Sequence, residues 1–223
     1  MATNPRIHVW ARSIVDQACA RVFGKKPTTK ARQIVQAIGL HEGGYGLATR
    51  PAYWAGSNNW GGVQASLPKG GACPAGTVLG EDYDSKGDAK YAVCFRVYPT
   101  SLDGAIGLVQ QLKARPGVVV ALETGSADRV AEAMYRSHYF GGFHPTKGKT
   151  GAELAAADAA NINDYATAIF NGAVKLTAAT GEKLEVKRTK LGASSSSSKS
   201  DGFVTWFALV PVGVLVALKA KFS

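Results

Sequence analysis

The chain has 223 residues, of which 46% are hydrophobic and 19% are charged, and its formal net charge is +10. This composition is typical of a packed globular protein and excludes an intrinsically disordered chain, which would carry far less apolar surface. The length allows one ordinary domain with a smaller appendage. The positive charge predicts an anionic partner such as a nucleic acid, an anionic lipid or an anionic cell-wall polymer.

The N-terminal residues predict an amphipathic helix. Ile7, Trp10, Ile14, Ala18 and Val22 recur at spacings of three and four, which places them on one helix face. Charged residues interrupt the apolar positions of this stretch, so it lacks the continuous apolar segment of a signal peptide.

A second helix is predicted from about Thr29 to Glu42. Ala31, Val35, Ile38 and Glu42 share one of its faces, so a carboxylate ends an otherwise buried stripe. Burial and the negative end of the helix dipole both oppose ionisation, so we expect a raised pKa for Glu42. A carboxylic acid that stays protonated near neutral pH is what protonation of a leaving group requires.

The glycine-rich sequence GGYG follows Glu42 directly. A turn of this kind lets a bulky ligand approach the acid closely, and this favours a functional role over the alternative of a solvated glutamate in a turn. His41 lies about 100° away around the helix and is expected at the rim of the site.

Residues 56–99 are rich in Gly, Asn and Pro and predict a small β-containing lobe inserted into a helical domain. The β-like runs are at 61–65, 77–80 and 91–98. The fold class is therefore α+β and mainly helical.

The three cysteines form neither a disulfide framework nor a metal-binding pattern, and we expect no metal and no cofactor. Cys19 falls in an apolar helix pattern and is expected in the core. Cys73 and Cys94 flank a loop-rich segment. They form either a disulfide, if the protein works outside the cytosol, or two separate thiols.

Further helices follow the β-containing segment. TSLD at 100–103 is a capping-box pattern that begins a helix ending before Pro116, and TGAE at 150–153 is another such pattern. Shorter helices are predicted at 117–123 and 127–138, and a last one at 163–179.

The C-terminal part changes character twice. Residues 181–201 contain a basic run and five consecutive serines, with almost nothing to bury, and predict a flexible tether. Residues 203–218 carry no charge and predict a C-terminal transmembrane anchor, slightly short of the roughly 20 residues of a full span; the alternative is a buried core helix or strand. The predicted organisation is a domain at 1–180, a linker at 181–201 and an anchor at 202–223.

Four segments in order resemble motifs of the lysozyme-like superfamily, and in particular its glucosaminidase family of flagellar and autolysin-type peptidoglycan hydrolases. They are HEGGYG at 41–46, SNNWGGVQ at 57–64, FRVYPTSLDGAIGLVQQL at 95–112, and the pair SHYFGGF at 137–143 with NDYATAIF at 163–170. The resemblance spans roughly residues 5–180. It implies a lysozyme-like domain with a small β-lobe.

The resemblance also implies roles for individual residues, with Glu42 as the general acid. The residues expected to line the sugar cleft are Tyr45, Asn59, Trp60, Gln64, Tyr139 and Tyr165. For three of them a structural role is the alternative: Trp60 and Tyr139 as core aromatics, and Asn59 as a turn residue.

A second carboxylate usually accompanies the acid in glycoside cleavage. The segment GEDYD offers Glu81, Asp82 and Asp84, of which we favour Glu81 and then Asp84; a solvated hairpin is the alternative explanation of these acids. Without a second carboxylate, cleavage could proceed through the N-acetyl group of the substrate or by a lytic transglycosylase route that needs no water.

These observations predict a membrane-anchored peptidoglycan hydrolase of the glucosaminidase or lysozyme type. A C-terminal anchor without a signal peptide suits a bacteriophage protein in a virion membrane or the host cell envelope, acting in cell-wall penetration or lysis. The alternatives are a lytic transglycosylase and a non-catalytic peptidoglycan-binding module. A nucleic-acid partner is not expected, because the basic residues are scattered rather than gathered in one stripe.

Overall fold

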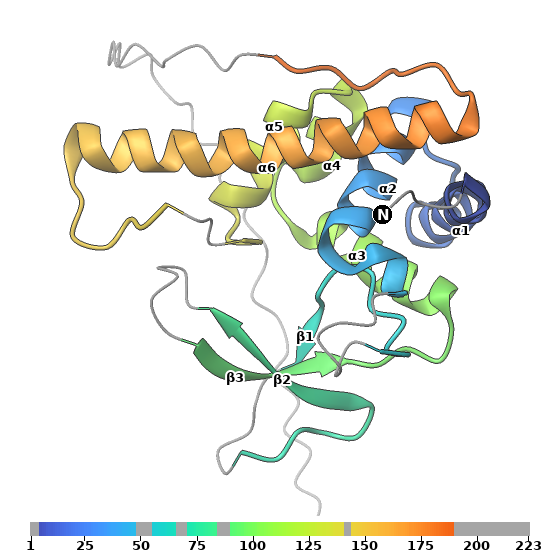
Figure 1. Cartoon of the computed structure of the whole chain (residues 1–223), viewed down its shortest axis with the longest axis horizontal. Helices are drawn as coiled ribbons and strands as arrows, with labels where there is room; N and C mark the ends of the chain where they lie inside the picture. Colours follow the sequence, from blue (N-terminus) through green and yellow to red (C-terminus); the bar gives the residue numbers. More distant parts are fainter. Residues whose placement is uncertain (1–4, 48–54, 66–70, 84–89, 141–143, 190–223) are drawn as a thin grey trace, which may run out of the picture. The chain divides into compact units, whose positions relative to one another are not determined.

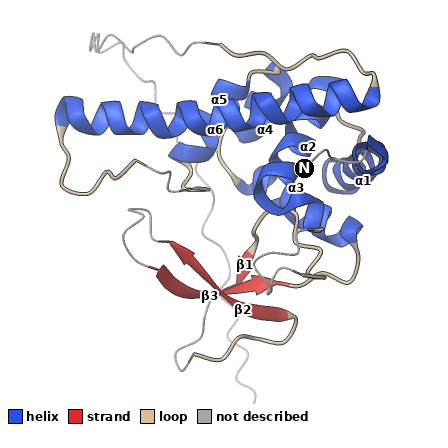
Figure 2. Ribbon diagram, in the orientation of Figure 1, coloured by secondary structure: helices blue, strands red, loops and turns tan. Residues whose placement is uncertain are grey.

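The computed structural model describes residues 5–47, 55–65, 71–83, 90–140 and 144–189. These form a group of helices with a small three-stranded sheet on one side of them (Figures 1 and 2). The predicted mainly helical α+β class is confirmed. In chain order the elements are α1 Pro5–Phe23, α2 Thr29–Gly43, the 3₁₀ turn η1 Gly44–Gly46, β1 Gln64–Ala65, β2 Thr77–Tyr83, β3 Lys90–Arg96, α3 Ser101–Ala114, α4 Val118–Thr124, α5 Ala127–Arg136 and α6 Gly151–Thr180.

The hydrophobic core lies between the helices, with α2 in contact with α1, α4 and α6. Apolar side chains at spacings of three and four on the helices meet there, and each fully buried Ile or Leu contributes roughly 1.5–3 kcal/mol. In α1 the face predicted from the sequence is only partly the buried one: Ala18 is 0% exposed, whereas Trp10 is 36% exposed and Val15 takes its place in the core. Ile34, Ile38, Leu108 and Ile169 are all 0% exposed. Cys19 is buried beside them as a free thiol, as predicted.

The helix ends partly follow the predicted caps. Thr100 accepts a hydrogen bond from the backbone N–H of Asp103, so the cap predicted for α3 is confirmed. The side chain of Thr150 makes no such bond, and α6 is one helix of 30 residues rather than a helix confined to 163–179. Its first half is rich in alanine, the strongest helix former, and no proline interrupts it.

The sheet is antiparallel in the order β1-β3-β2. β1 is much shorter than the predicted run at 61–65, because Asn59 folds the preceding residues into a turn: its Oδ1 accepts from the N–H of Val63 at 2.9 Å. The register pairs Asp82 with Tyr91 and Glu81 with Ala92. Since successive residues of a strand point to opposite faces, Asp82 and Glu81 lie on different faces of the sheet.

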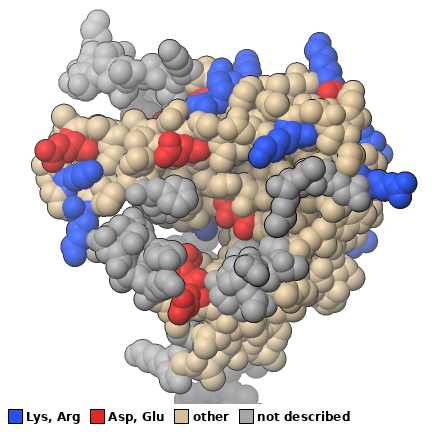
Figure 3. Space-filling model, viewed as in Figure 1, with Lys and Arg blue, Asp and Glu red and all other residues tan. Residues whose placement is uncertain are grey.

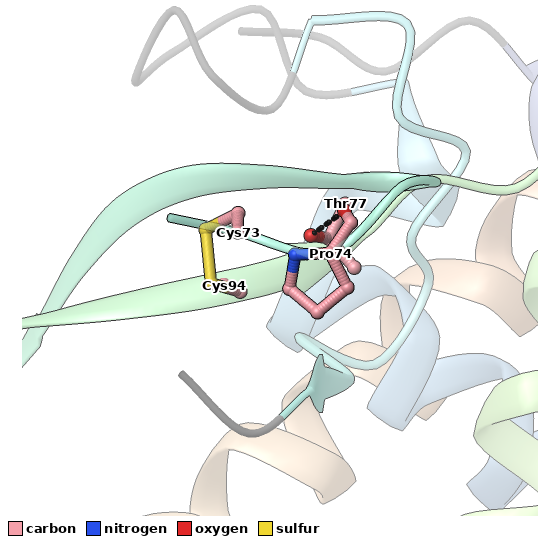
Figure 4. Close-up of a disulfide and its surroundings, with 4 residues drawn as sticks. All are labelled: Cys73, Pro74, Thr77 and Cys94. Atoms are coloured by element: carbon pink, nitrogen blue, oxygen red, sulfur yellow. Dashed lines mark hydrogen bonds between the residues drawn. A yellow bond between two sulfur atoms is a disulfide. The ribbon is translucent and has the colours of Figure 1, made fainter. Parts of the chain in front are cut away.

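A disulfide joins Cys73 to Cys94 and so fastens the segment before β2 to the central strand β3 (Figure 4). Next to it, the Thr77 hydroxyl donates to the carbonyl of Pro74 at 2.6 Å. The sheet buries few large side chains of its own, chiefly Val93 and Phe95, each 5% exposed. The covalent link therefore supplies stability that a lobe of this size cannot obtain from hydrophobic burial alone.

Residues 181–189, which were predicted as part of the tether, pack against the helices. Val186 is 4% exposed, and Glu182 accepts hydrogen bonds from Arg12 at 2.9 Å and Arg32 at 2.6 Å. Arg188 clasps the buried carboxylate of Asp128, with its Nε 3.0 Å from both carboxylate oxygens. The prediction was wrong here because the segment is held mainly by polar contacts to residues far away in the sequence, which its low apolar content does not indicate.

No helix among the described residues has the length and apolar content needed to cross a membrane. The predicted anchor at 203–218 and the serine-rich part of the tether lie outside the described residues.

Candidate active site

Glu42 occupies the last turn of α2, immediately before the chain leaves the helix. The helix ends at Gly44, whose left-handed backbone (φ 54°, ψ 35°) returns its N–H to the carbonyls of Gly39 and Leu40. The two residues after it, Tyr45 and Gly46, are also left-handed, with φ of 64° and 70°. Three successive left-handed residues turn the chain sharply away and leave the Glu42 side chain at the edge of the helical core.

Burial raises the pKa of Glu42 from its ordinary 4.5 to about 7, and the nearby charge of Asp82 acts in the same direction. A hydrogen bond from the Tyr165 hydroxyl to Oε1 opposes this, since it favours the ionised form. The raised pKa predicted for Glu42 is therefore confirmed in direction. The residue is half-buried, so its carboxyl group is poorly hydrated yet within reach of a ligand.

Aromatic rings hold Tyr165 against the acid. Tyr165 comes from the middle of α6 and is 6% exposed. Phe140 stacks on one face of its ring, with centroids 4.1 Å apart and planes 12° from parallel, and His41 meets it edge-on at 5.3 Å. His41 itself is exposed, consistent with the rim position expected for it.

Tyr139 is the second tyrosine near the acid. Its hydroxyl donates to the carbonyl of Gly61 at 3.2 Å, which links the end of α5 to the chain segment before β1. Burial, followed by the charge of Glu42, raises the pKa of Tyr139 well above its ordinary value. Glu42 therefore has two tyrosines near it whose raised pKa values keep their hydroxyl groups protonated at neutral pH.

Asp82 is the described sheet carboxylate whose charge reaches Glu42. Its Oδ2 accepts from Gln64 Nε2 at 2.5 Å and lies 3.5 Å from the hydroxyl of Tyr91. Glu81, which the sequence favoured, is exposed and points to the opposite face, the one that carries Cys94. We therefore replace Glu81 by Asp82 as the candidate second carboxylate; Asp84 lies outside the described residues.

The predicted cleft residues divide into two groups. Tyr165 hydrogen-bonds Glu42, and Tyr139 lies near enough for the charge of Glu42 to raise its pKa. Gln64 hydrogen-bonds Asp82, whose charge acts on the pKa of Glu42.

Tyr45, Asn59 and Trp60 are instead at most 1% exposed, so none of them faces a ligand in this structure. Asn59 uses its amide on the backbone of Val63 and Arg96. Trp60 packs on Tyr45 with ring centroids 5.1 Å apart. Their geometry corresponds to a turn residue and to core aromatics.

The acidic and basic side chains are distributed differently over the surface. On the face in Figure 3, acidic side chains lie over the helices and over the region of the sheet, while Lys and Arg gather mainly at the margin of the helical part. Two surface hollows of about 650 and 370 Å³ have no acidic residue in their walls. Within the described ranges, no three His, Cys, Asp or Glu side chains gather as metal ligands do.

Asp82 was named among the acids of GEDYD but not favoured, and Phe140 was not singled out, although it stands inside the motif SHYFGGF. For Phe140 the signal was the aromatic run SHYFGGF itself. Asp82 follows Glu81, and only the pairing of β2 with β3 reveals which of the two faces the helices. That pairing is a tertiary property that one strand alone does not encode.

Comparisons with protein-family models, with curated proteins and with solved structures find no match.

Proposed function

We propose that this chain cleaves the glycan strand of peptidoglycan, with Glu42 as the general acid. One observation carries the proposal: Glu42 is a half-buried carboxyl group with a pKa of about 7, and it accepts a hydrogen bond from Tyr165. At neutral pH about half of such groups hold a proton, and they surrender it readily, which suits general acid catalysis. The motif resemblance to lysozyme-like glucosaminidases supplies the substrate class.

The hydrogen bond from Tyr165 gives the two carboxyl oxygens of Glu42 different roles. Because Oε1 accepts the phenolic hydrogen, the acidic proton belongs on Oε2. In the proposed step this proton moves to the glycosidic oxygen as the bond from that oxygen to the anomeric carbon breaks, and positive charge develops on the sugar. The Tyr165 hydroxyl then stabilises the carboxylate that remains.

Asp82 is proposed to act on the sugar from the opposite side. Its carboxylate can stabilise the positive charge on the sugar, attack the anomeric carbon, or remove a proton from the attacking water. Gln64 holds one of its oxygens in place. A lytic transglycosylase on the same residues is the alternative: there the 6-hydroxyl of the muramic acid attacks, and no water is consumed.

The proposed substrate charge and membrane location are those expected from the sequence. A net charge of +10 suits an anionic wall polymer. We propose that residues 203–218 hold the enzyme at a membrane, in a phage virion or in the envelope of the host, where it opens or lyses the wall.

The test is digestion of purified peptidoglycan by the full chain, with Glu42→Gln as the matched variant. Mass spectrometry of the product ends names the reaction: reducing glucosamine for a glucosaminidase, reducing muramic acid for a muramidase, and anhydromuramic acid for a transglycosylase. We expect soluble fragments from the wild type and a loss of at least about 100-fold in the variant. Binding without release by the wild type would favour a non-catalytic module, and full activity of Glu42→Gln would refute the assignment of the acid.

A further inference from the structure

A buried polar chain joins α1 to the turn that follows Glu42. His8 in α1 and Tyr45 in the turn are 0% and 1% exposed, and the Tyr45 hydroxyl lies 3.0 Å from His8 Nδ1. Gln36 of α2, also buried, hydrogen-bonds the same hydroxyl, and its Nε2 donates to the carbonyl of His8 at 2.8 Å. Three segments of the chain therefore meet at one hydroxyl group.

Burial fixes the protonation of these groups. It lowers the pKa of His8 and raises the pKa of Tyr45, so the imidazole is neutral and the phenol keeps its proton. The bond between His8 Nδ1 and the Tyr45 hydroxyl therefore joins two neutral groups, and the tautomer of the imidazole sets which of them donates. His8 Nε2 is buried without a hydrogen-bond partner among the described residues, so the contact with Tyr45 is the one that orients the ring there.

The turn that this chain holds is under backbone strain. Tyr45 has a left-handed backbone (φ 64°, ψ 28°), a conformation that is unfavourable for a residue with a side chain. Gly46 is also left-handed and lies so close to Asn58 that an added Cβ would come within 2.6 Å of its carbonyl carbon. Conformations of this kind persist only where the surroundings impose them, and here the buried hydroxyl of Tyr45 provides a fixed anchor.

We propose that His8 and Tyr45 are positioning residues for Glu42. Their hydrogen bond fixes the turn, and the turn fixes where α2 ends. The Glu42 carboxyl is thereby held against Tyr165 and within reach of the charge of Asp82. The catalytic consequence rests on the proposed function, whereas the positioning itself is a property of the folded chain.

The first experiment compares Tyr45→Phe with the wild-type full chain. Tyr98→Phe is the control, since it removes the hydroxyl group of a half-buried tyrosine outside the site. Two properties are measured: the pKa of Glu42 by carbon NMR of labelled glutamate, and kcat and KM on peptidoglycan. We expect Tyr45→Phe to move the pKa of Glu42 from about 7 toward 4.5 and to lower kcat about tenfold with KM within twofold. The control should change neither.

A second pair of variants separates positioning from general stability. His8→Leu removes the hydrogen-bond partner of Tyr45, whereas His8→Asn places an amide group, which can accept or donate, close to the position of Nδ1. Asn is the poorer helix former, so a merely structural role predicts that it harms the protein at least as much as Leu. We expect the reverse. His8→Asn should keep the wild-type pKa of Glu42 and most of the wild-type kcat, whereas His8→Leu should lose both.

The outcomes distinguish this inference from the proposed function. An unchanged Glu42 pKa and kcat in Tyr45→Phe would overturn the inference; should that variant fail to fold, the His8 pair decides, and equal values for Leu and Asn would overturn it. If the wild type does not cleave peptidoglycan, the proposed function fails. The NMR titration then still decides whether His8 and Tyr45 position Glu42.

Discussion

Glu42 is under two opposing influences, and the balance between them sets its chemistry. Loss of hydration raises its pKa, whereas the hydrogen bond from Tyr165 lowers it, and the result is about 7 rather than 4.5. One pKa unit corresponds to about 1.4 kcal/mol between the two protonation states. The protein therefore spends part of its stability at neutral pH on keeping this group partly protonated.

The raised pKa predicts a pH-dependent effect of Glu42→Gln on stability. In the unfolded chain Glu42 ionises near 4.5, whereas in the folded protein it ionises near 7. The stability that the neutral carboxyl provides is therefore fully present below pH 4.5 and is lost as the pH rises to about 7. We expect Glu42→Gln to be more stable than the wild type by on the order of 2 kcal/mol at pH 8.

The free energy of unfolding of the wild type and of Glu42→Gln is measured by chemical denaturation at pH 4 and pH 8. The advantage of the variant should shrink at the lower pH, and an equal difference at both values would contradict the raised pKa.

Substitution of the two neighbouring acids of β2 should have opposite effects on activity. Asp82→Asn removes the charge that helps to raise the pKa of Glu42, so this pKa should fall, and activity should fall at least about 100-fold. Glu81→Gln is the matched control, because Glu81 adjoins Asp82 yet faces the other side of the sheet. It should change activity less than threefold. The test is to measure kcat/KM of both variants on peptidoglycan. A larger loss of activity in Glu81→Gln than in Asp82→Asn would make Glu81 the second carboxylate instead.

The position of Glu42 was predictable from the sequence, whereas the choice of Asp82 as the second carboxylate was not. The position of Glu42 follows from local geometry, since its place on the buried face of α2 is a matter of helical spacing. Asn59 and Trp60 were recognised as notable residues, yet their burial depends on the contacts of Asn59 with Val63 and Arg96 and of Trp60 with α2. The side of the sheet that Asp82 occupies depends on the register with β3. Neither property is local in sequence.

At the scale of elements, the sheet depends on its disulfide. Cys94 is on the central strand, so its link to Cys73 restrains all three strands. A closed loop of this size stabilises a fold by roughly 3 kcal/mol. We expect Cys73→Ser with Cys94→Ser to lose most activity while the helices stay folded.

Hydrogen exchange checks this by locating the change. Amides of β2 and β3 should exchange faster in the double variant, and those of α2 and α6 should keep their protection. Uniform loss of protection would show instead that the sheet and the helices unfold together.

The helices illustrate what periodicity can and cannot predict. Their existence followed from apolar spacing, as in α1 and α3, because such patterns are local. The length of α6 did not, since its first half has a polar and alanine-rich sequence with few apolar positions. That half is held through contacts such as the hydrogen bond from Tyr135 of α5 to Asp158.

At the scale of the whole molecule, residues 181–189 belong to the helical domain rather than to the tether. Arg188 and the N–H of Thr189 together satisfy the buried Asp128. A chain ending at residue 180 would leave that carboxylate without either partner, at a cost of about 3–5 kcal/mol. We expect residues 1–191 to fold with near full stability and residues 1–180 to be destabilised by at least about 3 kcal/mol. Thermal unfolding of the two checks this, and equal stabilities would contradict the assignment.

If a protonated Glu42 drives cleavage, kcat/KM on peptidoglycan must follow the protonation of this residue, and a pH profile from pH 6 to 9 measures that dependence. We expect the highest activity just below the pKa of Glu42 and a tenfold loss per pH unit above about 7. Glu42→Gln should show no such limb and almost no activity. A rate that stays constant from pH 6 to 9, or a Glu42→Gln variant with the wild-type profile, would contradict the account.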